Sequence, residues 1–224
     1  MSATFVSVAI DGPVGAGKSS IARTAAKELG YIYVDTGALY RAVGLYCRRN
    51  GVDIADIPAV EAVLPKAHPE IRLIDGVQHI YLNGEDVSEE IRLPEISMAA
   101  SAVSAIPAVR AALLDLQRDM AKTNNVIMDG RDIGTVVLPN ATVKIFLTAK
   151  PEIRAKRRYD ELVAKGVETT FEEVLSDLNT RDYNDSHRAT APLKQADDAV
   201  LADTSELDFG ASCELICNII KERV

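Results

Sequence analysis

The fold of this chain is constrained most by one eight-residue segment, Gly12-Pro13-Val14-Gly15-Ala16-Gly17-Lys18-Ser19. It matches the pattern G-x-x-x-x-G-K-[ST] in full, and it lies between an apolar run at 5–10 and an amphipathic helical pattern that begins at Ser19. Glycines let successive backbone N–H groups turn toward one anion, and a helix N-terminus adds partial positive charge. A glycine-rich turn that only joins a strand to a helix is the alternative, but this context favours a phosphate-binding loop.

The composition of this loop predicts a nucleotide site. We expect Lys18 to bridge the β- and γ-phosphates of ATP, and the Ser19 hydroxyl to ligate Mg²⁺. The predicted ATP-binding residues of the loop are Gly12, Pro13, Val14, Gly15, Ala16, Gly17, Lys18, Ser19 and Ser20. The N-K-x-D signature of guanine-specific GTPases is absent, and 224 residues are few for a motor or transporter ATPase. A small kinase or a nucleotide-binding module remains.

Strand-like and helix-like segments alternate along most of the chain. The apolar runs that indicate strands lie at 5–10, 31–34, 126–129, 143–147 and 199–202. Helical patterns separate them, including one at 95–122 that restarts at Pro107. This alternation predicts an α/β fold over 1–224: one P-loop NTPase-type domain with a parallel sheet of about five strands flanked by helices.

The middle of the chain follows a different pattern. Two short β-like runs within 71–82 flank Asp75-Gly76, a dipeptide typical of tight hairpins, and Asn83-Gly84 follows as a second turn. We therefore expect a small antiparallel insertion at about 63–93.

Charge and cysteine content exclude several classes of protein. The formal net charge of −8 argues against binding to nucleic acid polymers, which need a basic face. We find no apolar run long enough to span a membrane, and the first ten residues lack the basic start of a signal peptide.

Cys47, Cys213 and Cys217 fit buried thiols in a reducing compartment better than a zinc site, which would need more ligands nearby. We expect a cytoplasmic monomer.

Two polar segments predict a second anion site. Thr36 and Arg41 follow the second strand, and Arg131 follows the strand that ends at Asp129. Because parallel strands present their carboxyl ends at one edge of the sheet, this hydroxyl and these cations are expected beside the phosphate-binding loop. Taken singly, each segment could be a solvated helix charge or a polar turn; their coincidence favours a second phosphate facing the first.

Longer motifs give a specific resemblance. They are Asp-Thr-Gly-Ala-Leu-Tyr-Arg from Asp35, Asp-Gly-Arg-Asp-Ile-Gly-Thr-Val-Val from Asp129, Val-Lys-Ile-Phe-Leu from Val143, and Arg-Asp-Tyr-Asn-Asp-Ser-His-Arg-Ala-Thr-Ala-Pro-Leu from Arg181. With the P-loop, this combination resembles the bacterial cytidylate kinases over nearly the whole chain, including the insertion. The resemblance implies transfer of the γ-phosphoryl group of ATP to CMP or dCMP, and an insertion that enlarges the monophosphate-binding region.

The resemblance also implies a role for each matching residue. Arg41, Arg131 and Arg188 would hold the acceptor phosphate, together with the hydroxyl of Thr36, which stands where many relatives carry Ser. Ser101, Arg110 and Asp132 would read the cytosine, and Arg181 and Asp185 would contact the sugar. Arg154, Arg157 and Arg158 lie in a stretch, about 151–168, that resembles the mobile lid over ATP. The implied catalytic residues are Lys18, Arg131 and Arg188.

The chemistry of the reaction is compatible with this set of residues. An acceptor phosphate oxygen is already anionic, so no strong general base is needed, and positioning with charge neutralisation would carry catalysis. The arginines of 154–158 could instead form one exposed helix face, and those of 181–188 could pair with Asp182 and Asp185 on an ordinary surface. Two further functions stay open: a kinase for another small acceptor, such as another monophosphate or shikimate, and a non-catalytic nucleotide-binding module.

Overall fold

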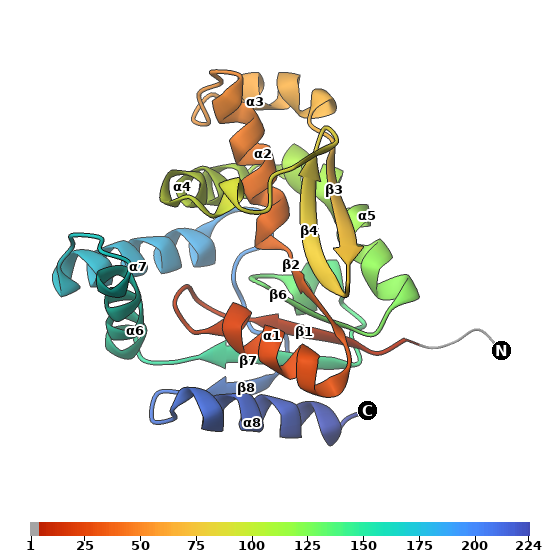
Figure 1. Cartoon of the computed structure of the whole chain (residues 1–224), viewed down its shortest axis with the longest axis vertical. Coiled ribbons are helices and arrows are strands. Elements are labelled where there is room, and N and C mark those ends of the chain that lie inside the picture. The colour runs from red at the N-terminus through yellow and green to blue at the C-terminus, as the bar shows by residue number, and fades with distance from the viewer. Residues whose placement is uncertain (1–4) are drawn as a thin grey trace.

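The computed structural model describes residues 5–224, and its centre is a five-stranded sheet (Figure 1). The strands follow the order β2-β6-β1-β7-β8, and every neighbouring pair is parallel. Their bounds are β1 Ser7–Asp11, β2 Ile32–Asp35, β6 Val126–Gly130, β7 Val143–Thr148 and β8 Val200–Asp203. The predicted parallel sheet is therefore confirmed, with each strand within two residues of the expected run.

Helices cover both faces of this sheet. Val8 and Ile10 of β1 pack with α1 (Lys18–Leu29) and α8 (Phe209–Lys221), whereas Ala9 between them faces the other cluster, toward α5 (Pro107–Thr123) and a π-helical turn at Ile133–Val137. This alternation is the two-residue period of a strand buried on both sides. The remaining helices on this frame are α6 (Pro151–Ala164) and α7 (Phe171–His187), which pack against each other at one end of the molecule (Figure 1).

A second, smaller sheet is antiparallel, as expected. It consists of β3 (Pro69–Ile74), β4 (Val77–Leu82) and β5 (Glu85–Asp86). Asp75 and Gly76 both have positive φ, 51° and 75°, which is the backbone that a two-residue hairpin with right-handed twist requires. The same conformation recurs at the second turn, where φ is 51° at Asn83 and 86° at Gly84.

The ends of the predicted insertion differ from its centre. Residues 57–66 form a short α-helix and a 3-10 turn, α3 (Ile57–Val63) and Leu64–Lys66, which the sequence pattern did not indicate. Another 3-10 turn, Glu90–Arg92, leads into α4 (Pro94–Val103). The antiparallel sheet thus occupies only 69–86 of the expected 63–93.

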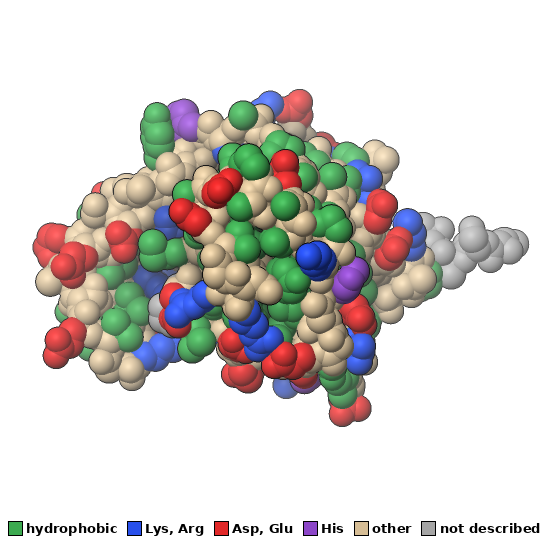
Figure 2. Space-filling model, turned by 90° about the horizontal axis from the view of Figure 1, so that it is seen from above, with side chains coloured by type: hydrophobic (Ala, Val, Ile, Leu, Met, Phe, Trp, Pro, Cys, Tyr) green, Lys and Arg blue, Asp and Glu red, His purple; other side chains and the backbone are tan. Residues whose placement is uncertain are grey.

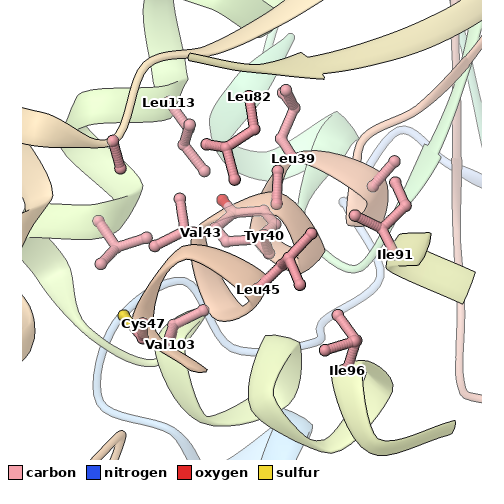
Figure 3. Packing of buried hydrophobic residues seen from close by; sticks show 14 of the residues in the cluster. Leu39, Tyr40, Val43, Leu45, Cys47, Leu82, Ile91, Ile96, Val103 and Leu113 are labelled. Carbon is pink, nitrogen blue, oxygen red and sulfur yellow. The ribbon is translucent and has the colours of Figure 1, made fainter. Parts of the chain in front are cut away.

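The helix α2 (Gly37–Arg49) ties the small sheet to the rest of the fold. Leu39, Val43 and Leu45 are at most 2% exposed, and they pack with Leu82 of β4 and Leu113 of α5 in one apolar cluster (Figure 3). Such a cluster is close-packed and low in compressibility, so a shift of one element is felt by the others. This core lies under the start of α2, where two of the predicted site residues are located.

The three cysteines of the chain lie in apolar clusters. Cys213 and Cys217 are free thiols buried in the cluster between α8 and α1, and Cys47 of α2 is buried in the apolar cluster around that helix, which confirms the expected buried cysteines. Across residues 5–224, none of the helices is both long enough and apolar enough to span a lipid bilayer.

Candidate active site

The carboxyl ends of three adjacent strands bring the predicted residues together. β1 leads into the phosphate-binding loop, β2 into Thr36 and Arg41, and β6 into Arg131 and Asp132. The register places Asp35 of β2 and Ile10 of β1 on either side of Asp129. Ligands bind at this edge in open α/β sheets because helix N-termini and loops converge there.

The phosphate-binding loop has the backbone that its glycines allow. Gly15 and Gly17 have φ of 74° and 85°, and Gly17 forms the N-cap of α1. At Gly12 an added Cβ atom would lie 1.9 Å from the carbonyl oxygen of Leu147, so only glycine fits beside β7. The Lys18 ammonium is buried and donates to the Pro13 carbonyl at 2.6 Å, across the mouth of the loop. The loop is therefore an anion cradle of N–H groups with one buried cation.

Asp129 connects this loop to the sheet. Its Oδ2 accepts a hydrogen bond from the Ser19 hydroxyl at 2.8 Å, and its Oδ1 accepts one from the Tyr33 hydroxyl at 2.9 Å. Burial raises the pKa of Asp129, and the nearby Asp35 carboxylate raises it further. A hydroxyl beside a carboxylate at the first turn of the P-loop helix is an oxygen donor set that suits Mg²⁺. The residues present therefore fit the predicted metal.

Thr36 and Arg41 lie at the start of α2, as expected. The buried Thr36 hydroxyl donates to the Asp129 carbonyl at 2.8 Å, and Arg41 donates to Asp35 Oδ2 at 2.5 Å. The Nε atom of Arg41 is buried and has no partner among the described residues. A donor left unpaired inside a protein is costly, so this atom has capacity for a ligand acceptor.

Lys18, Arg131 and Arg181 form a cluster of cations. Arg131 donates from Nε to the buried carboxylate of Asp185 at 2.7 Å. Burial lowers the pKa of Lys18 and of Arg181, and in both cases the neighbouring Arg131 charge lowers it further. Buried positive charges that lie close together repel one another, and a bound anion relieves this repulsion. The cluster therefore suits a phosphate group. Acidic and basic side chains are mixed on the face of the molecule seen in Figure 2.

The predicted base-reading residues form a second cluster. Asp132 accepts hydrogen bonds from Arg110 and, at 3.2 Å, from Arg188, and all three side chains are less than 10% exposed. Ser104 joins them: its carbonyl accepts from Arg110 at 3.1 Å, and its hydroxyl accepts from Arg188 at 3.5 Å. Ser101 lies one turn earlier on α4, and its carbonyl accepts from the Ser104 hydroxyl.

A cavity of about 360 Å³ opens beside this cluster. Its lining includes Tyr40, Arg110, Val136, Val137 and Ala191. A mostly apolar lining that includes one arginine suits a flat heterocycle held by a few polar contacts.

Asp11 holds the loop that carries Asp132. Its two carboxylate oxygens accept from the backbone N–H groups of Ile133 and Gly134 at 2.8 and 2.7 Å. Burial is the largest effect on this carboxyl and raises its pKa to about 6, against the lowering effect of the two hydrogen bonds. Asp11 is the last residue of β1, so one strand supports both the phosphate-binding loop and the loop that carries Asp132.

The three arginines of α6 point in different directions. Arg154 is buried and donates to the Val14 carbonyl at 2.7 Å and to Asp182 at 2.6 Å, while Asp182 also accepts from the Val14 N–H at 3.1 Å. Arg157 donates to the carbonyls of Thr204 and Leu207 beyond β8. Arg158 is exposed and pairs with Glu161. The arginines therefore do not share one helix face.

The acidic pairing considered for the 181–188 segment is present in a different form. Asp182 pairs with Arg154 and Asp185 pairs with Arg131. Both carboxylates of α7 therefore bind arginines outside the 181–188 segment. Sequence reasoning assigned no role to Asp11, Asp35 or Asp129. Their signal was available, because Asp11 and Asp35 end their strands and Asp129 is one residue before the end of β6.

The parallel sheet and the phosphate-binding loop define a P-loop kinase fold. A family model described as cytidylate kinase matches residues 8–222. The chain is 48% identical over 223 residues to the cytidylate kinase of Caldicellulosiruptor bescii, covering 98% of this chain and 99% of the relative. It is also 48% identical over 221 residues to that of Mycobacterium leprae, covering 98% and 97%. The chain belongs to the cytidylate kinase family.

Similarity to solved structures concerns the fold alone. An uncharacterized protein from Eubacterium ventriosum superposes with a TM-score of 0.55 at 10% sequence identity, over 97% of this chain and 99% of that one.

Proposed function

We propose that this enzyme transfers the γ-phosphoryl group of ATP to CMP or dCMP and releases ADP with CDP or dCDP. The bond from the γ-phosphorus to the bridging oxygen of ADP breaks, and a bond to an oxygen of the acceptor phosphate forms. The observation that carries the proposal is the pair of clusters on one sheet edge: Lys18 with Arg131 and Arg181 near the P-loop, and Asp132 between Arg110 and Arg188.

The charges of the first cluster support transfer between two phosphates. In this proposal Lys18 and the loop N–H groups bind the donor, and Arg41 and Arg131 hold the acceptor phosphate. Asp35 and Asp185 position these two arginines through hydrogen bonds. Cations held in a desolvated site stabilise the charge on the transferring group without having to reorganise. Mg²⁺, bound with the nucleotide through Ser19 and supported by Asp129, would neutralise phosphate charge.

The second cluster supports the choice of cytosine. The carboxylate of Asp132 can accept from the N4 amino group, and a guanidinium can donate to N3 and O2. Uracil would set its O4 against the carboxylate and its N3–H against a cation. In this proposal Arg188 serves the acceptor phosphate, Ser101 assists Arg110 at the base, and Arg181 with Asp185 contacts the sugar.

The remaining parts of the proposal concern the lid and the organisation of the enzyme. We assign residues 151–168 to a lid over ATP, with Arg154, Arg157 and Arg158 as its ATP-side arginines, and the 63–93 region to the monophosphate site. The proposal includes action as a monomer on free nucleotides in the cytoplasm.

A panel of acceptors with ATP, followed by coupled detection of ADP, tests the proposal. We expect ADP formation that depends on CMP or dCMP and is nearly abolished by Lys18→Ala, while CMP binding persists. Faster turnover with another monophosphate or with shikimate would instead identify a kinase for a different acceptor. No acceptor-dependent ADP formation at all would support a binding module.

A further inference from the structure

A side-chain amide on β4 pairs with the backbone of the main sheet. Gln78 Oε1 accepts from the Asp35 N–H at 2.6 Å, and Gln78 Nε2 donates to the Asp35 carbonyl at 3.1 Å. β2 is an edge strand, so the outward backbone groups of Asp35 have no neighbouring strand to pair with. Gln78 therefore supplies the donor and the acceptor that another strand would have supplied.

The residue held in this way also controls the start of α2. Asp35 Oδ1 accepts from the Ala38 N–H at 3.1 Å, and Oδ2 accepts from Arg41. The packing is tight at Gly37, where an added Cβ would lie 3.2 Å from Asp35 Oδ1 and 3.4 Å from Arg41 Nη1. A displacement of the Asp35 backbone would therefore move the Arg41 guanidinium, whose buried Nε has no partner among the described residues.

Gln78 lies where the small sheet passes from buried to free. Further along β4, Ile80 and Leu82 are 2% and 3% exposed and belong to the core around α2. On the other side, Val77 is 60% exposed at the hairpin tip. Gln78 makes two directional hydrogen bonds to the Asp35 backbone. They fix the position of β4 relative to β2 more closely than an apolar contact would.

We propose that Gln78 is a positioning residue for the acceptor-phosphate site: its pairing with the Asp35 backbone docks the small sheet against β2 and holds Arg41 in its binding geometry. The inference rests on the proposed function, because the role of Arg41 belongs to that proposal. It assigns Gln78 no contact with substrate.

The test compares Gln78→Met and Gln78→Glu with a matched control, Asn83→Asp. Asn83 makes the same kind of two-point pairing, accepting from the His68 N–H at 2.8 Å and donating to the Lys66 carbonyl at 3.1 Å, but within the small sheet and its approach. We expect both Gln78 variants to raise KM and Kd for CMP at least about fivefold, with KM for ATP within about twofold. Asn83→Asp should leave KM and Kd for CMP within about twofold.

A double-mutant cycle with Arg41→Ala separates positioning from general loosening. If Gln78 acts through Arg41, then Gln78→Met has little further effect on CMP binding in the Arg41→Ala background. Equal effects in both backgrounds, or an unchanged KM for CMP in Gln78→Met, would overturn the inference. Thermal unfolding of each variant identifies loss of fold; if Gln78→Met is unfolded, Gln78→Glu, which keeps the shape of the side chain and the acceptor for the Asp35 N–H, decides. Failure of the wild type to bind CMP would instead overturn the proposed function, and the role of Gln78 with it.

Discussion

At the scale of single residues, Asp132 is shared between two arginines. It neutralises Arg110 and Arg188 in a place where each side chain is less than 10% exposed. Replacement by alanine would leave two buried guanidinium groups without this partner, which costs free energy whatever the substrate. An amide of the same shape is therefore the sharper probe of base choice.

Asp132→Asn is expected to lower kcat/KM for CMP at least about tenfold and to narrow the preference for CMP over UMP. The amide oxygen can still accept from the cytosine N4 amino group, but the amide NH₂ can donate to uracil O4. The measurement is kcat/KM for both nucleotides in the wild type, Asp132→Asn and Asp132→Ala. Equal losses for CMP and UMP in the asparagine variant would remove Asp132 from base recognition.

Asp11 predicts a pH dependence of stability. Its folded pKa of about 6 lies above the ordinary value of 3.8, so between these values the folded state binds more protons than the unfolded state. The contribution of Asp11 is therefore fully present below about pH 4 and falls as the pH rises through 6, by about 3 kcal/mol in total.

Asp11→Asn removes this titration. The measurement is the free energy of urea unfolding of wild type and variant at several values between pH 4 and 8. As the pH rises, the wild type should lose stability relative to the variant. Asp208→Asn, which alters a carboxylate that caps α8 away from the site, is the control. If the difference in unfolding free energy between wild type and variant stays constant with pH, the raised pKa of Asp11 is wrong.

At the scale of elements, α6 and α7 form a unit that holds the phosphate-binding loop. Val14 packs against the small apolar cluster of Ala155, Val174 and Leu178. Asp182 and Arg154 together bind both the N–H and the carbonyl of Val14. The helix pair therefore contacts the ATP loop through its backbone, which fits the assignment of this region to the ATP side.

Asp182→Asn should raise KM for ATP several-fold and leave KM for CMP nearly unchanged, because it weakens the contact to Val14 and leaves Arg154 buried with a neutral partner. The expected loss of stability is about 1–3 kcal/mol, typical for a buried charge deprived of its hydrogen-bonded partner. Steady-state kinetics with each substrate varied in turn gives the comparison. The exposed Asp177 on the same helix provides the control Asp177→Asn. Parallel changes in both KM values would contradict a role confined to the ATP side.

At the scale of the whole molecule, two bodies adjoin the main sheet: the small sheet with α2, and the helix pair α6 and α7 (Figure 1). In the proposed function, the body of the small sheet, α2 and α4 serves the acceptor, and the body of α6 and α7 serves ATP. Their shared base is the carboxyl edge of β1, β2 and β6. This arrangement allows each body to respond to its own ligand.

Hydrogen exchange tests this division. We expect CMP to slow amide exchange mainly in β3, β4 and α4, and a non-hydrolysable ATP analogue to slow it mainly in α6 and α7, because each ligand gives its body new contacts. The ligand-free enzyme gives the baseline, and Arg41→Ala should lose the CMP effect alone. Identical protection maps for the two ligands would show that the bodies respond as one.

Local sequence determined the elements of this protein. Asp75-Gly76 and Asn83-Gly84 require the backbone of a tight hairpin, Pro107 restarts a helix, and the glycines of the P-loop allow a fold of the chain that other residues would block. These features depend on residues within a few positions of one another, so the sequence alone predicts them. The motif resemblance likewise pointed to the family that the comparisons establish.

The tertiary structure alone decided which distant side chains meet. Gln78 gives no local signal, and it acquires a role only because β4 lies beside the open edge of β2. Asp185 pairs with Arg131, 54 positions away, and Arg154 turns toward Asp182 and Val14, although a periodic pattern equally fits an exposed face. Polar partners across such separations are selected by the packing of whole elements and by the cost of leaving buried charges unpaired, and neither is encoded in a short stretch of sequence.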